Sequence, residues 1–336
     1  MSEYIVDRLG QLGDGIIDTP NGEIFAPFTL PGEHIEGNVE NGRVNSPKII
    51  KPVSDRIKPA CKHFKSCGGC SLQHASDTVI SDWKIRKTQD ALSQVNLHPE
   101  FRPIINSKAG SRRRATFSAK RTKKGALVGF HGRASDVIIE ISECPISDPI
   151  LLSGMPAFSQ FAILGSSRKA VLRISATVSG NSLDVKIDNG KKLSATEISK
   201  FAQICNQFKI LRLMWNDDVI AQSNPPSQKM GLADVIPPSG AFLQATKSGE
   251  AALIKTVLEI IGPSKRVVDL FAGCGTFALP ISSKATVHAL EGDVNMIAAL
   301  DSGWRAAGGL HDIKSETRDL FRRPLMPDEF KKIDAI

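Results

Sequence analysis

The sequence lacks several features that would place it in a membrane or outside the cell. It has no run of about eighteen apolar residues, the length needed to span a bilayer. Its N-terminus, Met1-Ser2-Glu3-Tyr4, lacks the basic-then-apolar layout of a signal peptide. No internal repeat or low-complexity tract is evident. We therefore expect a cytoplasmic protein with no membrane partner.

Cysteine is also scarce, with six residues in a chain of 336. In a long cytosolic chain this number favours metal ligation or catalysis over a disulfide framework. The chain length predicts two to three domains, about 100 to 200 residues each.

The charge balance is positive, with 43 Lys and Arg against 35 Asp and Glu, a net charge of +8 and a pI near 9.2. Such a balance favours RNA or DNA as a partner, although it also serves solubility alone. Seven cations fall within thirteen residues and raise the expectation of nucleic-acid binding: Arg112, Arg113, Arg114, Lys120, Arg121, Lys123 and Lys124.

The chain divides into three predicted domains. Residues 1–55 contain short apolar stretches separated by turn signals at Asn21-Gly22 and Asn41-Gly42, which predicts an OB-like, all-β barrel or a small barrel without a ligand. Residues 56–240 form a mixed α+β central domain. We expect helices at 75–95 and 196–208, and strands at 126–130, 137–141, 170–178, 183–187, 211–215 and 219–222.

Residues 241–336 alternate helix and strand. Helices are expected at 250–261 and 294–307, strands at 266–271, 286–290 and 312–316, and a fourth strand at 332–336. This order predicts a doubly wound, Rossmann-like α/β domain, which ends inside the fourth strand and is therefore expected to be incomplete.

A glycine turn follows the first of these strands. Gly273 and Gly275 let the backbone approach a ligand, and Glu291, which ends the next strand, can accept hydrogen bonds from ribose hydroxyls. The spacing from Asp269 is typical of an S-adenosylmethionine (SAM) turn; the alternative is a plain βα turn. Asp319 is a candidate for the adenine edge or a solvated loop acid.

Three thiols and two glycines lie within ten residues, at Cys61, Cys67 and Cys70, and Cys144-Pro145 follows far downstream. Thiolates favour an iron–sulfur cluster or zinc over calcium and magnesium. Zinc held by Cys67 and Cys70 together with His63 and His74 is the alternative.

These motifs, in this order along essentially the whole chain, resemble the RNA uracil-5-methyltransferase family. The resemblance rests on Cys-x5-Cys-Gly-Gly-Cys, Ser71-Leu72-Gln73-His74, the later Cys-Pro, the stretch from Arg112 to Phe117, Phe242-Leu243-Gln244 and Asp-Leu-Phe-Ala-Gly-Cys-Gly-Thr-Phe. It implies a TRAM domain at 1–55 and a [4Fe–4S] cluster on Cys61, Cys67, Cys70 and Cys144. It also implies SAM contacts at Gln244, Asp269, Phe271, Gly273, Gly275, Thr276, Glu291 and Asp319, and RNA contacts at Arg112, Arg113 and Arg114, for which a solvated strand face is the alternative.

The resemblance also implies the reaction, in which a thiolate adds to C6 of a uracil and C5 then takes a methyl group from SAM. The nucleophile and the base are expected beyond Ile336, since Cys205 and Cys274 lack a suitable context, and this chain alone is expected to be inactive. The cluster cysteines favour 23S ribosomal RNA over tRNA as substrate. A non-catalytic RNA-binding protein is the alternative, and a monomer is expected.

Overall fold

The structure is a computed structural model, and it describes residues 2–330 and 332–336. The chain forms two compact units. The first comprises the residues up to Ile105 together with Phe130–Glu143, and the second comprises Asn106–Gly129 and Cys144–Ile336. The predicted three-domain division stays a prediction.

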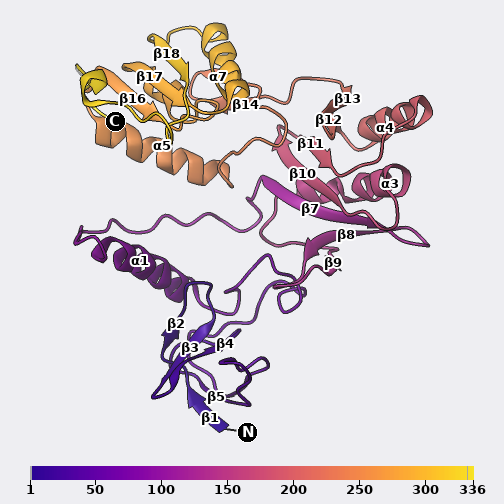
Figure 1. Cartoon of the computed structure of the whole chain (residues 1–336), viewed down its shortest axis with the longest axis vertical. Helices are drawn as coiled ribbons and strands as arrows, with labels where there is room; N and C mark the ends of the chain where they lie inside the picture. Colours follow the sequence, from indigo (N-terminus) through magenta and orange to yellow (C-terminus); the bar gives the residue numbers. More distant parts are fainter. Residues whose placement is uncertain (1, 331) are drawn as a thin grey trace. The chain divides into compact units, whose positions relative to one another are not determined.

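The N-terminal part of the first unit is built from two three-stranded sheets (Figure 1). One has the order β1 (Ser2–Ile5), β5 (His34–Gly37), β6 (Lys48–Lys51), and the other the order β2 (Arg8–Leu9), β3 (Gly15–Thr19), β4 (Gly22–Ala26). Alternate apolar residues meet in one small core of Val6, Ile17, Ala26, Ile35 and Val44. Gly22, at a φ of 113°, makes the predicted turn between β3 and β4, a conformation that favours glycine.

Helix α1 (Asp77–Ser93) follows the cysteine-rich segment, as predicted. It begins where the side chain of Ser76 accepts a hydrogen bond from the backbone N–H of Val79. The indole Nε1 of Trp83 donates to the carbonyl of Gly10 at 3.0 Å, which fixes the helix against the β2–β3 connection. Strand β9 (Ile138–Glu140) also belongs to this unit.

The second unit contains a central sheet with the order β13-β12-β11-β10-β7-β8. Its strands are β7 (Arg114–Arg121), β8 (Ala126–His131), β10 (Leu172–Ser179), β11 (Ser182–Asp188), β12 (Ile210–Trp215) and β13 (Asp218–Gln222). The boundary between the units falls inside β8. Helix α4 (Ala195–Gln207) connects β11 to β12, which accounts for their parallel pairing.

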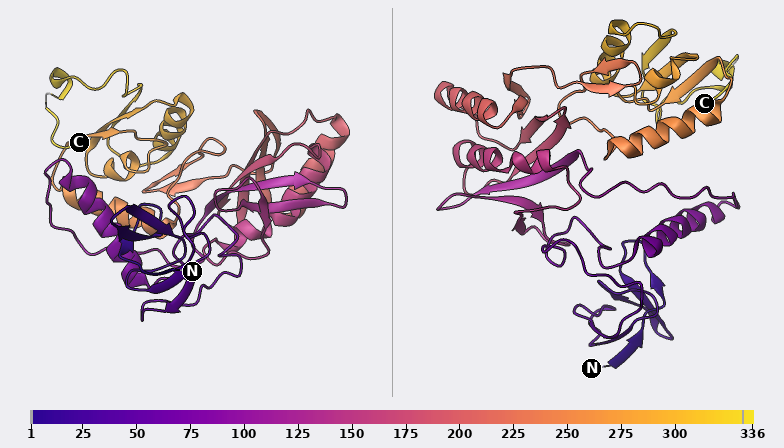
Figure 2. Two further views of the ribbon diagram at one scale, coloured as in Figure 1. Left: turned by 60° about the horizontal axis from the view of Figure 1, so that its bottom comes forward. Right: turned by 180° about the vertical axis from the view of Figure 1, so that it is seen from behind.

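Helices α3 (Met155–Gly165) and α4 supply aromatic side chains to the central core, and α2 (Pro149–Ser153) adds Leu151. Both views of Figure 2 show α3 and α4 side by side along the sheet. Phe117 of β7 packs on Phe158 of α3 with ring centroids 5.4 Å apart. The sequence did not predict α2 or α3. Because α3 is apolar around most of its circumference, it has no polar face to set a helical period.

The C-terminal part of the second unit has the predicted alternation of helix and strand. Its elements are the hairpin β14 (Gln228–Met230) and β15 (Ala233–Val235), then α5 (Lys247–Ile261), β16 (Arg266–Leu270), α6 (Ala278–Ile281), β17 (Thr286–Glu291), α7 (Val294–Ala306), β18 (Ile313–Thr317) and the 3-10 turn η1 (Pro327–Phe330). Strands β16, β17 and β18 are parallel and lie in that order. Ala335 pairs with Val267 in parallel, where the sequence predicted a fourth strand.

Candidate functional site

The turn after β16 adopts a conformation that few residue types tolerate. Gly273 and Gly275 have φ angles of 57° and 98°, and Phe271 has a φ of 58°. A Cβ on Gly275 would lie 2.7 Å from the side chain of Leu279. The left-handed Phe271 is costly for a residue with a side chain, and such strain concentrates at functional sites.

Glu291 ends β17, and two backbone N–H groups hold its carboxylate. Gly273 donates to Oε2 at 3.0 Å and Asp293 donates to Oε1 at 3.0 Å. The glycine turn and the carboxylate therefore form one rigid arrangement, which leaves further lone pairs on both oxygens for a ligand.

A cavity of about 500 Å³ opens beside this arrangement. Five of the eight residues predicted to contact SAM line it: Gln244, Phe271, Gly273, Thr276 and Glu291. They come from the segment before α5, the glycine turn and the end of β17, so the fold gathers residues that are far apart in sequence. Asp269, Gly275 and Asp319 are not among its lining residues.

Asp269 is a buried carboxyl at the end of β16, with 9% of its surface exposed. Burial raises its pKa to about 6, against the opposing effect of a hydrogen bond from the backbone of Ala278. Its Oδ2 has no hydrogen-bond partner among the described residues. Asp269 thus accepts a hydrogen bond from the backbone of the helix that follows the glycine turn.

Asp319 holds the loop that follows β18. Its Oδ1 accepts the backbone N–H groups of Phe321 and Arg322, at 3.1 and 3.2 Å. Phe321 is 89% exposed, and its ring centroid lies 5.4 Å from that of Phe271 at the cavity. The predicted contact between Asp319 and adenine stays a prediction.

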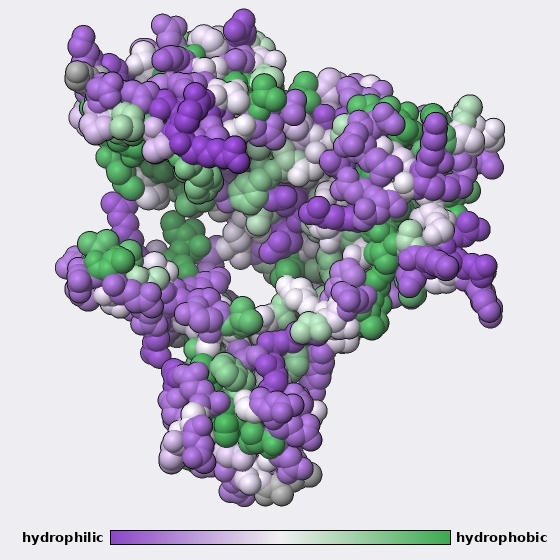
Figure 3. Space-filling model, in the orientation of Figure 1, coloured by the Kyte–Doolittle hydropathy of each residue, from purple (hydrophilic) through white to green (hydrophobic). Residues whose placement is uncertain are grey.

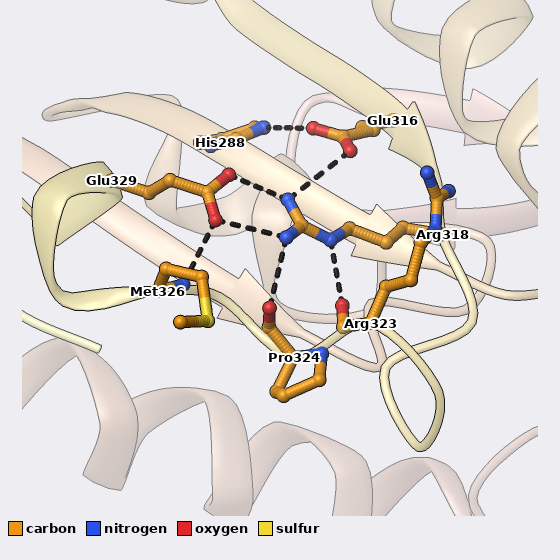
Figure 4. Close-up of polar contacts among 7 residues, drawn as sticks. All are labelled: His288, Glu316, Arg318, Arg323, Pro324, Met326 and Glu329. Carbon is orange, nitrogen blue, oxygen red and sulfur yellow. Dashed lines mark hydrogen bonds and ion pairs between the residues drawn. The ribbon is translucent and has the colours of Figure 1, made fainter.

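The same loop is fastened by Arg318 (Figure 4). Its guanidinium makes a two-point ion pair with Glu329, at 2.6 and 2.9 Å, and donates to the carbonyls of Arg323 and Pro324. The pKa of Glu329 is lowered to about 2, and the hydrogen bond from Arg318 is the largest cause. The pair therefore remains charged across the physiological pH range.

The three consecutive arginines have different environments. Arg112 is exposed, whereas Arg113 is 4% exposed and pairs with Glu250 at 2.5 Å. The interpretation of Arg113 as an RNA contact does not fit this burial, because its guanidinium is already used inside the protein. Arg114 is half-buried, with its guanidinium 5.0 Å from the ring centroid of Phe242, which also lines the cavity.

The cysteines form no disulfide bond. Cys61, Cys67 and Cys70 belong to the first unit and Cys144 to the second. Among the described residues, no three His, Cys, Asp or Glu side chains are gathered to hold a metal ion. Thiolates suit a cluster chemically, the cluster stays a prediction, and no reaction step is derived through it.

The other two cysteines are buried and poorly suited to nucleophilic attack. Burial raises the pKa of Cys205 to about 12 and that of Cys274 to about 11. Both are therefore protonated thiols at neutral pH. No described helix combines the length and apolarity required to cross a membrane.

A parallel sheet with a strained glycine turn after its first strand and a fixed carboxylate after its second is the arrangement of Rossmann-like methyltransferases. The fold agrees with a solved structure of the Pyrococcus abyssi tRNA (uracil-54, C5)-methyltransferase in complex with S-adenosyl-L-homocysteine, at a TM-score of 0.71 and 17% identity. The match covers 94% of this chain and 79% of that chain.

Sequence comparison gives the family. An uncharacterized RNA methyltransferase of Rhizobium meliloti is 40% identical over 98% of this chain and 81% of the relative. The 23S rRNA (uracil(1939)-C(5))-methyltransferase RlmD of Aromatoleum aromaticum is 27% identical over 93% of this chain and 77% of its own length. No protein-family model matches the chain. The chain belongs to the RNA methyltransferase family of the Rhizobium meliloti relative.

Proposed function

We propose that this protein takes part in the transfer of a methyl group from SAM to C5 of a uridine in RNA, with 23S ribosomal RNA as the substrate. The observation that carries the proposal is the convergence of Gln244, Phe271 and Glu291 on one cavity. RlmD, which acts on 23S rRNA, supports the choice of RNA. The tRNA enzyme of similar fold makes tRNA the alternative substrate.

The residues of the cavity have separate parts in this proposal. Glu291, held by two backbone N–H groups, accepts hydrogen bonds from the ribose hydroxyls of SAM. Gly273 lets the ligand approach the backbone, and Phe271 and Gln244 line the same cavity. SAM supplies the electrophilic methyl group.

The uracil must become nucleophilic at C5, which requires a thiolate that adds to C6 and a base that later removes the C5 proton. Cys205 and Cys274 are protonated and buried, so neither suits the first part. The placement of both groups beyond Ile336 stays a prediction. A binding-only protein is the second candidate, because neither of these two buried thiols suits nucleophilic attack.

The [4Fe–4S] cluster on Cys61, Cys67, Cys70 and Cys144 and the TRAM identity of residues 1–55 also belong to the proposal. The cluster is supported by four cysteines that form no disulfide bond. The TRAM identity is supported by the short strands of the N-terminal sheets. We assign the cluster no step in methyl transfer.

Calorimetric titration with SAM and S-adenosylhomocysteine tests the cavity. Glu291→Gln keeps the size of the side chain but removes its charge, and it should weaken binding at least tenfold, because charge-assisted hydrogen bonds contribute about 1.5–3 kcal/mol. Asp312→Asn, an exposed acid before β18, is the control and should bind as the wild type does. Equal affinity in wild type and Glu291→Gln would contradict the proposed cavity.

Methyl transfer to 23S rRNA fragments and to tRNA tests the substrate. Labelled methyl groups should enter 23S rRNA at C5 of a uridine when the assayed protein includes the nucleophile and the base predicted beyond Ile336. Incorporation into tRNA alone would overturn the choice of substrate. RNA binding without SAM binding would favour the binding-only candidate.

A further inference from the structure

One end of the central sheet gathers cations from separate parts of the chain. Strand β7 ends there and turns into β8, with Lys120 opposite Leu127 and Arg121 opposite Ala126. Strand β10 begins at the same end, because Leu172 pairs with Ala119 of the antiparallel β7. The loop between α3 and β10 therefore lies beside the β7–β8 turn.

Seven cations occupy this end, and we name them the cation cluster: Lys120, Arg121, Lys123, Lys124, Arg168, Lys169 and Arg173. Lys120 is half-buried and the other six are exposed. None of the seven side chains forms an ion pair or a hydrogen bond within the described part of the chain. Figure 3 shows a strongly hydrophilic surface over the end of the sheet where the β7–β8 turn lies.

Several other cations of this unit, unlike those of the cation cluster, have acidic partners inside the protein. Arg113 pairs with Glu250, and Arg212 makes a two-point contact with Asp184 at 2.9 and 2.7 Å. Asp188, opposite Arg173 in the register, lies 3.6 Å from Lys186. The cation cluster concentrates seven positive charges at one end of a sheet, in a chain whose net charge is +8. Such a concentration is repulsive unless an anion covers it.

The cation cluster is connected to the cofactor cavity by β7. Arg114, at the other end of β7, lies against Phe242 of the cavity. Lys120 is six residues further along, about 20 Å at the rise of an extended strand. Arg114 and Lys120 are an even number of residues apart and so project from the same face of the sheet.

We propose that the cation cluster is a second RNA-contact surface, which binds phosphates of the substrate about 20 Å from the cofactor cavity. This inference rests on the proposed function, since it takes RNA as the polyanion. Lysines and arginines without internal partners bind phosphates through charge and release counterions, with no need to read bases. The cluster holds RNA that flanks the methylated nucleotide, while the cavity selects that nucleotide.

The salt dependence of RNA binding tests the inference. The triple variant Arg121→Gln, Lys123→Gln, Lys124→Gln is compared with the wild type on a 23S rRNA fragment by fluorescence anisotropy between 50 and 200 mM salt. Each lost phosphate contact lowers the slope of log K against log salt by about 0.7–0.9, so the slope should fall by about two units. Affinity at low salt should fall at least tenfold, while binding of S-adenosylhomocysteine stays unchanged.

The matched control removes three exposed lysines outside the cation cluster, through Lys200→Gln, Lys284→Gln and Lys314→Gln. It should keep the slope of the wild type. An unchanged slope in the cluster variant would overturn this inference alone. A wild type that bound no RNA would overturn the proposed function, and the inference with it. The wild type and the cluster variant are also tested on anionic phosphatidylserine vesicles. If only the wild type bound the vesicles, and both bound RNA equally, a lipid surface would replace RNA as the ligand of the cation cluster.

Discussion

The guanidinium of Arg113 lies 2.5 Å from the carboxylate of Glu250, and both side chains are at least nine-tenths buried. Arg113 directly precedes β7 of the central sheet, and Glu250 lies in the first turn of α5. Arg113 also donates to the carbonyl of Gln244, at 3.1 Å. One buried pair thus joins the central sheet to the helix that precedes the methyltransferase strands, and fixes the backbone of a cavity residue.

We expect Glu250→Gln to lower the free energy of unfolding by about 3–5 kcal/mol, because it leaves a buried guanidinium without its counter-charge. Urea denaturation measures the loss. The control is Glu259→Gln on the same helix, where the exposed pair with Lys255 spans 3.9 Å and should contribute less than about 1 kcal/mol. A loss below about 1 kcal/mol for Glu250→Gln would contradict a tight buried pair.

Asp269 makes stability depend on pH. Because burial raises its pKa from 3.8 to about 6, the folded chain holds this proton more tightly than the unfolded chain. The associated stability is complete below about pH 4 and is lost as the pH rises through 6. Asp269→Asn cannot ionise, so its stability relative to the wild type should increase by about 1 kcal/mol from pH 5 to pH 8.

Urea denaturation at both pH values measures the difference for Asp269→Asn. Asp312→Asn removes an exposed carboxyl and is the control. If the difference in free energy of unfolding between wild type and Asp269→Asn stayed constant over this range, folding would not raise the pKa of Asp269.

The clamp of Arg318 predicts the protease sensitivity of the loop after β18. Arg318→Met removes the contacts to Glu329, Arg323 and Pro324, so the loop should open and trypsin should cleave after Arg322 several times faster. Arg318→Lys keeps the charge but not the planar fork, and should give an intermediate rate. Arg305→Met, an exposed position on α7, should leave the rate unchanged.

Purification without oxygen tests the cysteine motif. A cluster predicts brown protein with broad visible absorbance and stoichiometric iron, both lost in Cys67→Ser. Cys205→Ser, buried in α4, should keep the iron. Colourless protein that carries zinc would replace the cluster by the alternative with His63 and His74.

The parts of the fold that the sequence predicted are those determined locally. The strands of residues 266–316 follow from continuous apolar stretches, and the glycine turn follows from residues within five positions of one another. The cavity then follows from the rule that parallel strands present their carboxyl ends at one edge. For this reason Glu291 and Gly273 could be placed together without a structure.

The burial of Arg113 could not be predicted in the same way, because its partner Glu250 is 137 residues away in the sequence. A run of three arginines looks uniform, yet neighbouring residues at the start of a strand point to opposite faces. The cation cluster was visible in part, through Lys120 to Lys124, but Arg168, Lys169 and Arg173 join it only through the pairing of β7 and β10.

The pairing of Ala335 with Val267 gives the backbone N–H of Val268 an acceptor, the carbonyl of Ala335 at 2.9 Å. The side of β16 away from β17 is thereby occupied, and the amide proton of Val268 is shielded for as long as residues 334–336 stay in place. Its exchange with deuterated solvent consequently reports the detachment of these three residues, at a free energy below that of global unfolding. The exchange rate of the single amide of Val268 thus reports how often residues 334–336 detach from β16.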